Sequence, residues 1–133
     1  MGSRTIKFRG KRVGSGVWAK GFLIEDYFDH DEEKHYDMVI YHSASYVPVD
    51  PATVGQFTGL KDKNEVEIYE GDVFRLRNTP DMTVKWREQY ADFMCCYEKG
   101  WRGYNLTKTQ VTRLSLKVVG NIHDKERTHE QGC

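Results

Sequence analysis

The sequence lacks an apolar run approaching the roughly 20 residues that a transmembrane helix needs, and no signal-peptide pattern precedes Ile6. Its 133 residues include only three prolines and three cysteines. Cys95 and Cys96 are adjacent, so they point to opposite sides of a strand and cannot form an ordinary disulfide with each other. Because there is no disulfide framework and no CxxC pair, we expect a reducing, cytoplasmic compartment.

The sequence also lacks an excess of either charge, since 20 basic and 20 acidic residues cancel. Net charge therefore predicts no particular partner. The charges are unevenly distributed, however. Residues 1–24 carry six Lys or Arg and no acid, residues 25–33 carry six Asp or Glu and no base, and residues 99–123 carry five Lys or Arg and no acid. Such blocks indicate charged surfaces rather than a fold class.

The sequence also lacks extended helical periodicity. Apolar residues alternate with polar ones along most of the chain, as in Thr5–Arg9 and Val73–Arg77. This period of two indicates short strands, and their close spacing predicts an all-β (mainly β) protein built as a small barrel or sandwich. A turn or a single helical turn is expected to begin at Asp50-Pro51, and a turn of helix is expected within residues 87–92. Residues 25–35 are predicted to be a loop, because they are too acidic for a core element.

The alternation also predicts which side chains are buried and how the chain is divided. We expect residues 1–50 to form an N-terminal β-hairpin region with an acidic loop, residues 51–123 a small β-barrel, and residues 124–133 a flexible tail. The predicted barrel core consists of apolar side chains that share one face of their strands: Val66, Ile68, Phe74, Leu76, Val84, Trp86, Phe93, Leu116 and Val118.

Three blocks of sequence together resemble one protein family. The first is residues 6–11, IKFRGK, followed by Trp18 and Gly21; the second is VGQFTGLKDKN and EIYEGD within residues 54–72; the third is VVGNIH at residues 118–123. Over about residues 4–123 the chain is similar to the YopX family of small phage and prophage proteins. The resemblance implies an SH3-like small barrel in the C-terminal half and a bacterial host cytoplasm. It implies no established activity and no catalytic residues.

The chain departs from the family pattern at the apex of the central loop, where Glu65 follows Asn64 in place of the usual glycine. A two-residue type I′ turn needs a positive φ at both central positions, which glycine accepts more readily than glutamate. The loop therefore takes another form, or Glu65 is mildly strained.

No motif predicts catalysis, a cofactor or a metal. The glycines Gly10, Gly14 and Gly16 match neither the Walker nor the dinucleotide pattern, and a hairpin loop explains them. Possible ligands within residues 29–35 and at His42 lack a helical spacing that would fix them, so a solvated acidic loop is expected there. Cys95 alternates with apolar residues and is expected in the core, whereas Cys96 is expected on the other side. We therefore predict a non-enzymatic protein.

Nucleic-acid binding is the first functional hypothesis. Basic side chains that oppose apolar residues on strands are expected to face outward and to form a continuous surface if their strands are neighbours. The candidates are Lys7, Arg9, Arg75, Arg77, Lys85, Arg87, Arg102 and Lys117. Outward cations on strands also prevent edge-to-edge aggregation, which is the alternative explanation.

Protein binding is the second hypothesis. The acidic segment is expected to meet a basic partner or the basic N-terminal strand of another copy, with Tyr27 and Phe28 as apolar anchors and Asp31 and Glu32 as charged contacts. The two aromatic residues could instead hold the loop on the barrel. If the acidic segment competes with nucleic acid for the basic surface, deleting residues 26–33 will strengthen nucleic-acid binding.

Overall fold

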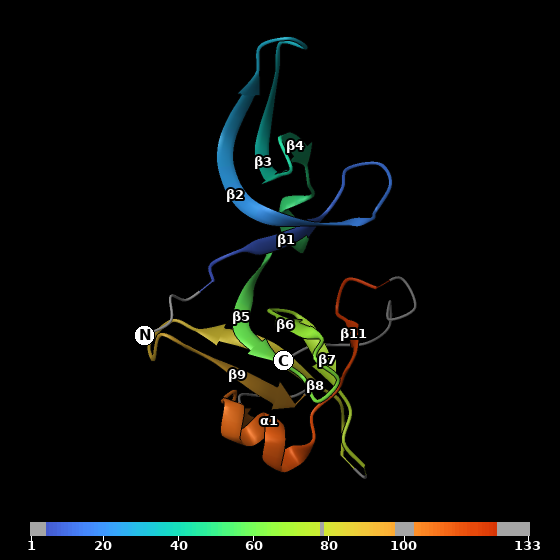
Figure 1. The fold of residues 1–133 in the computed structure, drawn as a ribbon, viewed down its shortest axis with the longest axis vertical. Helices are drawn as coiled ribbons and strands as arrows, with labels where there is room; N and C mark the ends of the chain where they lie inside the picture. The colour runs from blue at the N-terminus through green and yellow to red at the C-terminus, as the bar shows by residue number, and fades with distance from the viewer. Residues whose placement is uncertain (1–4, 78, 98–102, 125–133) are drawn as a thin grey trace. The chain divides into compact units, whose positions relative to one another are not determined.

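A computed structural model describes residues 5–77, 79–97 and 103–124 (Figure 1). The chain divides into two compact units, residues 1–57 and residues 58–133. The boundary falls inside a strand, whereas the sequence suggested one at residues 50 and 51. Residues 125–133 of the predicted tail lie outside the described ranges. Within those ranges, no helix has the length and apolar character needed to cross a membrane.

The first unit is built from antiparallel strands. They are β1 (Phe8–Lys11), β2 (Trp18–Asp29), β3 (Lys34–His42), β4 (Ser45–Pro48) and the start of β5 (Gly55–Lys61). The sheet order is β4-β3-β2-β1-β5-β6, in which β6 (Glu67–Tyr69) belongs to the second unit. A 3-10 helix, η1 (Pro51–Thr53), precedes β5 and confirms the predicted helical turn. Its cap is Asp50, whose Oδ1 accepts a hydrogen bond from the Ala52 amide.

The prediction that residues 25–35 form a loop is wrong. Residues 25–29 continue β2 and residues 34–35 begin β3, so only residues 30–33 connect the two strands. Acidic side chains are compatible with these strands because most of them project into solvent rather than into a core. The many charges of residues 25–35 therefore keep this segment out of a buried core, but they do not prevent its backbone from pairing in strands.

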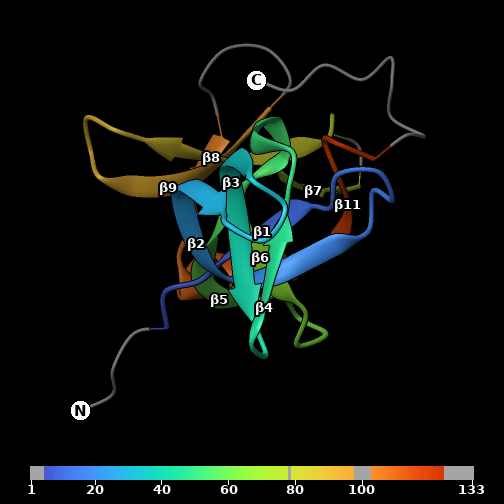
Figure 2. The same ribbon diagram turned by 90° about the horizontal axis from the view of Figure 1, so that it is seen from above.

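The second unit contains an open five-stranded antiparallel sheet in the order β10-β9-β8-β7-β11. Its strands are β7 (Asp72–Phe74), β8 (Met82–Arg87), β9 (Asp92–Tyr97), β10 (Gly103–Asn105) and β11 (Val118–Asn121). Figure 2 shows the turn between β8 and β9 at the free end of these two strands. The mainly β prediction is confirmed, whereas the SH3-like barrel stays a prediction because this sheet has two edges.

An α-helix, α1 (Lys108–Leu114), was not predicted. Its N-cap is Thr107, whose hydroxyl accepts a hydrogen bond from the Gln110 amide at 3.1 Å. Thr-x-x-Gln is a capping-box pattern, which is the sequence signal for this helix. The helix has seven residues and two threonines, too short and too rich in β-branched residues for periodicity to identify. It buries Val111 against the core.

The core of the second unit consists of buried side chains from the sheet and the helix segment: Ile68, Phe74, Met82, Val84, Cys95, Leu106, Val111 and Leu116. Leu76, Phe93 and Val118 pack against it and are partly buried. Two predicted core residues are wrong, because Val66 is 48% exposed and Trp86 is 42% exposed. Both alternate in sequence with polar residues, as buried positions do. Val66, however, comes just before β6, and Trp86 is the next-to-last residue of β8, and neither belongs to the buried cluster. Cys96 is also buried rather than solvent-facing.

The loop between β5 and β6 is organised by a buried carboxylate. Asp62 is 3% exposed, and its Oδ1 accepts hydrogen bonds from the amides of Asn64 and Val66. Its Oδ2 accepts from the Val118 amide at 2.9 Å. The Glu65 amide donates to the Asp62 carbonyl, and Glu65 has φ +64°. The loop therefore takes a form other than a type I′ pair, a turn followed by one left-handed residue, and Glu65 is that residue.

A second buried carboxylate joins the start of β7 to the end of β11. Asp72 is 1% exposed; its Oδ2 accepts from the Tyr69 amide and its Oδ1 from the Asn121 side-chain amide. Gly71 has φ +92°, and a Cβ there would lie 3.1 Å from the Asn121 amide nitrogen. The EIYEGD and VVGNIH blocks therefore meet in space and hold two distant strands together.

Candidate functional site

The most exposed structured element of the first unit is the part of the β2–β3 hairpin formed by residues 25–37, which we call the arm (Figure 1). Among the residues that the structure describes, β2 and β3 pair within the arm only with each other. β1 pairs with Trp18–Gly21 and β4 pairs with Val39–His42, so neither covers the arm's outer edges. A two-stranded ribbon with two open edges is marginally stable in water by itself.

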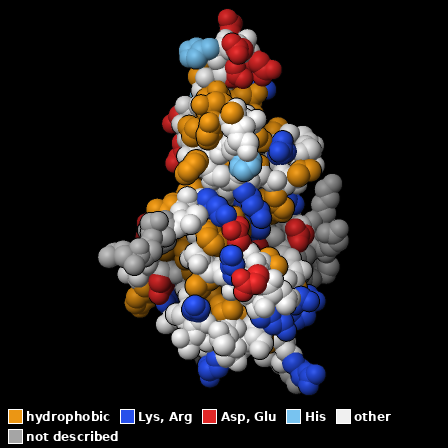
Figure 3. All heavy atoms as spheres, viewed as in Figure 1, with side chains coloured by type: hydrophobic (Ala, Val, Ile, Leu, Met, Phe, Trp, Pro, Cys, Tyr) orange, Lys and Arg blue, Asp and Glu red, His pale blue; other side chains and the backbone are white. Residues whose placement is uncertain are grey.

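The tip of the arm is acidic. Asp29 Oδ1 accepts hydrogen bonds from the amides of Asp31 and Glu32, at 2.9 and 3.2 Å, which closes the connection between the strands. The side chains of Asp31 and Glu32 are exposed, as predicted for charged contacts. The arm contains seven Asp or Glu and one Lys. Figure 3 shows the red acidic side chains gathered at the tip, with orange apolar side chains nearer the rest of the unit.

Aromatic side chains line the arm and its base. The Tyr27 and Tyr46 rings stack with centroids 4.9 Å apart and planes 13° apart, and Tyr41 contacts Tyr46 at the same distance. Tyr46 is 49% exposed and Phe28 is 44% exposed. Phe28 packs against the edge of His30 at 4.8 Å. Desolvation in this cluster, followed by the nearby negative charge of Asp29, raises the pKa of Tyr27.

Sequence reasoning identified Tyr27 and Phe28 but missed Tyr41 and Tyr46. The register explains why: Tyr41 is the direct cross-strand partner of Tyr46, and both lie outside the acidic segment on which the hypothesis was based. Aromatic residues at alternate or opposed strand positions are the signal that could have found them.

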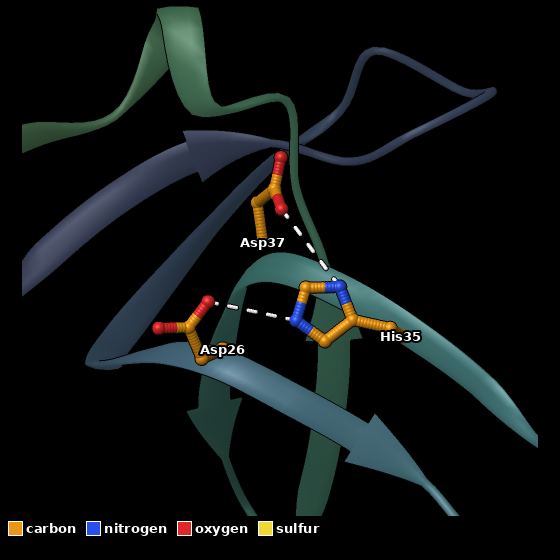
Figure 4. Close-up of side chains that lie close together, drawn as sticks. All are labelled: Asp26, His35 and Asp37. Atoms are coloured by element: carbon orange, nitrogen blue, oxygen red, sulfur yellow. Dashed lines mark ion pairs between the residues drawn. The ribbon is translucent and has the colours of Figure 1, made fainter.

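One group of side chains on the arm could share a cation. Figure 4 shows His35 between two carboxylates, with Nε2 3.5 Å from Asp26 Oδ1 and Nδ1 3.9 Å from Asp37 Oδ1. The three possible ligand atoms lie within 4.8 Å of one another, but all three side chains are exposed. Their shared contacts are those of a solvated charge cluster on paired strands, and we assign no metal to it.

In the first unit, the predicted basic residues contact aromatic rings. Lys7 Nζ lies 5.2 Å from the centroid of Phe57, and Arg9 Cζ lies 4.2 Å from the centroid of Trp18. Lys11 Nζ lies 5.3 Å from the same Trp18 ring. The prediction that Arg9 faces solvent is wrong, because the residue is only 8% exposed. Alternation along β1 placed its side chain correctly opposite Phe8, but the guanidinium lies over the Trp18 ring instead of projecting freely into solvent.

In the second unit, two predicted phosphate-binding residues have carboxylate partners. Arg75 donates to both carboxylate oxygens of Asp81, at 2.9 and 3.0 Å. Arg87 does the same with Asp92, at 2.9 and 2.8 Å. This contact lowers the pKa of Asp92, chiefly through the hydrogen bond. Such pairs remove much of the positive potential that attracts phosphates.

The remaining basic residues are scattered. Arg77 and Lys117 are exposed and Lys85 is half-buried. Arg77 lies beyond the end of β7 instead of on a strand. Arg102 lies outside the described residues. The continuous basic surface stays a prediction.

The Cys95 thiol has no catalytic setting. Its side chain is fully buried, and this desolvation raises its pKa to about 11. A thiol with so high a pKa is almost entirely protonated near neutral pH and is a weak nucleophile.

The residues that carry the family signature have structural roles. Asp62, Asp72 and Asn121 tie loops and strands together through buried hydrogen bonds. Gly21 lies where β2 passes close to Tyr41, and a side chain there would collide with the Tyr41 carbonyl. These signature residues therefore stabilise the fold.

Comparison with known proteins agrees with this architecture. The crystal structure of protein EF1440 from Enterococcus faecalis resembles the chain with a TM-score of 0.56 and 20% identity, covering 96% of this chain and 100% of that one. At that identity the likeness concerns the fold. No curated protein matches the sequence. The profile of the YopX protein family matches residues 18–127, which is most of the sequence. The chain therefore belongs to the YopX protein family.

Proposed function

We propose that the protein is a non-enzymatic binding module whose arm docks on a protein partner with a basic surface. The observation that carries this proposal is a two-stranded ribbon with open edges and exposed aromatic side chains, which contributes little to the small core of its unit. Exposed aromatic residues are the types enriched at the centres of interfaces.

Charge identifies the class of partner. Seven acidic side chains and one lysine within 13 residues create a locally negative surface in a protein whose total charge is zero. Complementary potentials accelerate encounter and select against acidic partners. In the bound state, Phe28 and Tyr46 supply apolar area, and Asp31 and Glu32 contribute at the polar rim.

The test replaces Phe28 and, separately, Tyr46 with p-benzoylphenylalanine for photo-cross-linking in host lysate. Val119, an exposed apolar residue on β11 in the second unit, provides the control position. The partner identified is then purified, and its affinity is measured by titration calorimetry. We expect Phe28→Ala or Tyr46→Ala to weaken binding roughly tenfold or more, the effect of losing about 1.4 kcal/mol at an interface anchor.

The charged contacts have a different expected signature. Asp31→Lys with Glu32→Lys should slow association, and this effect should shrink as salt is added. A partner that binds both aromatic variants as tightly as the unchanged protein would refute the arm as the docking site. Cross-linking only to a second copy, together with a dimer in light scattering, would identify the partner as the protein itself.

Nucleic-acid binding is the second candidate, and one observation favours it. Lys7, just before β1, and Arg9 and Lys11 on β1 lie over Phe57 and Trp18, a combination of cations and aromatic rings that also occurs in single-strand binding proteins. Fluorescence anisotropy at low salt, with single- and double-stranded probes, tests this. Binding that weakens with salt, and weakens further in Lys7→Ala, would support it; an absence of binding would remove it. Deleting residues 26–33 should then increase affinity if the acidic arm competes.

The family resemblance supports an accessory role in a phage or prophage, acting in the cytoplasm of the bacterial host. Neighbouring genes provide the test of this part of the proposal. Phage structural or regulatory genes on both sides would support it, whereas a setting among chromosomal housekeeping genes would count against it.

A further inference from the structure

The turn between β8 and β9 borders a cavity of about 710 Å³ in the second unit. Its described lining consists of consecutive residues around this turn: Trp86, Arg87, Glu88, Gln89 and Tyr90. The volume lies within the range of small-molecule sites, which are usually lined by aromatic residues with a few oriented polar groups. None of these residues belongs to the arm, so a ligand here would be independent of the docking surface proposed above.

The two aromatic rings of the lining are exposed although both have packing partners. Trp86 meets Phe93 edge-on, with centroids 4.9 Å apart and planes 65° apart, and remains 42% exposed. Tyr90 is 61% exposed, and Arg87 Cζ lies 4.5 Å from its ring centroid. Both rings are therefore held by a neighbour while keeping surface on which a flat molecule could stack.

Arg87 has a fixed orientation and unused donors. Its Nε and Nη2 donate to the two carboxylate oxygens of Asp92, and Nη2 also donates to Asn105 Oδ1 at 2.9 Å. A guanidinium has five N–H groups, so the two on Nη1 remain after these three bonds. Within the described part of the chain, they have no acceptor. Because Asp92 neutralises the charge, this side chain is better suited to a neutral acceptor than to a phosphate.

We propose that this cavity binds a nucleobase, which stacks on Trp86 or Tyr90 and accepts hydrogen bonds from Arg87 Nη1. A flat heterocycle matches the exposed rings, and an acceptor on the edge of its ring system matches an Nη1 hydrogen. Guanine has two acceptors, O6 and N7, on one edge, whereas adenine has N7 beside an amino group that donates. The base is either part of a free nucleotide or an unpaired base in a single strand.

The test is a titration followed by the indole N–H signal of Trp86 and the backbone signal of Tyr90 in ¹H–¹⁵N NMR spectra. The ligands are guanosine monophosphate, adenosine monophosphate and a short guanine-containing single-stranded oligonucleotide. We expect guanosine monophosphate to bind at least about fivefold more tightly than the adenine compound, since adenine has an amino donor where guanine has the O6 acceptor and one hydrogen bond is worth about 1 kcal/mol. The mononucleotide affinity should change little with salt, unlike phosphate-driven binding to the β1 cations.

Variants separate stacking from hydrogen bonding. Tyr90→Ala and Trp86→Ala should each weaken binding roughly fivefold or more if they supply the stacking surface, because stacking is worth about 1–3 kcal/mol per base. Arg87→Lys should remove the preference for guanine. Phe22→Ala, which truncates an equally exposed aromatic residue in the first unit, is the matched control and should leave binding unchanged.

The outcomes also identify the source of the base. An oligonucleotide that binds much more tightly than the mononucleotide assigns the site to single strands, whereas equal affinities assign it to free nucleotides. The proposal is overturned if none of the three ligands shifts the Trp86 or Tyr90 signals. It is also overturned if Tyr90→Ala and Trp86→Ala bind as tightly as the Phe22→Ala control.

Discussion

The two units bury their apolar residues to very different extents. In the second unit, strands and helix α1 share a cluster of eight buried side chains, whereas the buried cluster of the first unit consists of Ala19, Ile40 and Val49. The first unit compensates with partly buried neighbours such as Phe8 and Leu23. Its arm extends beyond this cluster, and Phe28 in the arm and Tyr46 beside it are 44% and 49% exposed.

The two units also differ in whether their carboxylates are buried or exposed. The buried carboxylates Asp62 and Asp72, both in the signature blocks, hold the second unit together. Asp29, in the arm, makes similar hydrogen bonds to backbone amides but at an exposed turn. Side chains in the second unit therefore mainly stabilise the fold, whereas those in the arm are available to a partner.

The strongest test of this contrast compares two phenylalanines. Phe74 is fully buried, so Phe74→Ala should lower the free energy of unfolding by about 3–5 kcal/mol. Phe28→Ala, in the arm, should cost less than about 1 kcal/mol because the side chain is already 44% exposed. Chemical denaturation of both variants gives the two values. Trp86→Ala should also cost clearly less than Phe74→Ala; equal losses would place Trp86 in the core after all.

A second comparison concerns carboxylates that accept backbone hydrogen bonds. Asp62→Ala leaves the amides of Asn64, Val66 and Val118 without their acceptor, and it should cost about 2–4 kcal/mol because buried donors lose their partners. Asp29→Ala should cost under about 1 kcal/mol, since water can replace its hydrogen bonds. Thermal unfolding of the two variants measures the difference. Similar melting temperatures would show that the Asp62 loop does not hold the unit together.

The third test is a substitution that should raise the stability of the second unit instead of lowering it. Glu65 has φ +64°, so Glu65→Gly should raise the free energy of unfolding by a few tenths to about 1 kcal/mol. The reverse change at a glycine with positive φ, Gly71→Ala, should be destabilising, because its Cβ would also crowd Asn121. A Glu65→Gly variant with an unchanged or lower denaturation midpoint would contradict the left-handed conformation at this residue.

The smallest expected effect is electrostatic. Arg87 lowers the pKa of Asp92 below its ordinary value in the folded protein. The pair therefore stabilises the fold above the unfolded-state pKa of Asp92, and this contribution is lost as the pH falls through the folded-state pKa. Carboxyl ¹³C NMR titration should show the lowered value. Arg87→Ala should return it toward the ordinary range, while a titration unaffected by that change would exclude the ion pair in solution.

Much of the second unit is predictable from local alternation. Ile68, Phe74 and Val84 are buried as expected, because their strands cross the core and a period of two selects the correct face. Val66 and Trp86 show the limit of that rule. Alternation identifies the face of a strand, but it does not say how far along the strand the opposite layer extends.

The binding surfaces were less predictable. The acidic composition of residues 25–35 suggested a loop, yet hydrogen bonding between β2 and β3 depends on backbone groups that charge does not remove. Likewise, the positive charge of Arg75 and Arg87 was evident, but their carboxylate partners depend on how the chain folds around them. Both carboxylates lie within six residues of their arginines, but it is the turn between them that brings each pair face to face.

The sequence by itself determined the family and the predominance of β-structure. These depend on patterns within a few residues, where side-chain size, charge and backbone preference act directly. Only the tertiary structure decided that Asp62 and Asp72 tie remote strands together, and that Phe28 and Tyr46 stay exposed. Those relations depend on contacts between segments far apart in the chain, because burial and pairing are set by the packing of whole strands.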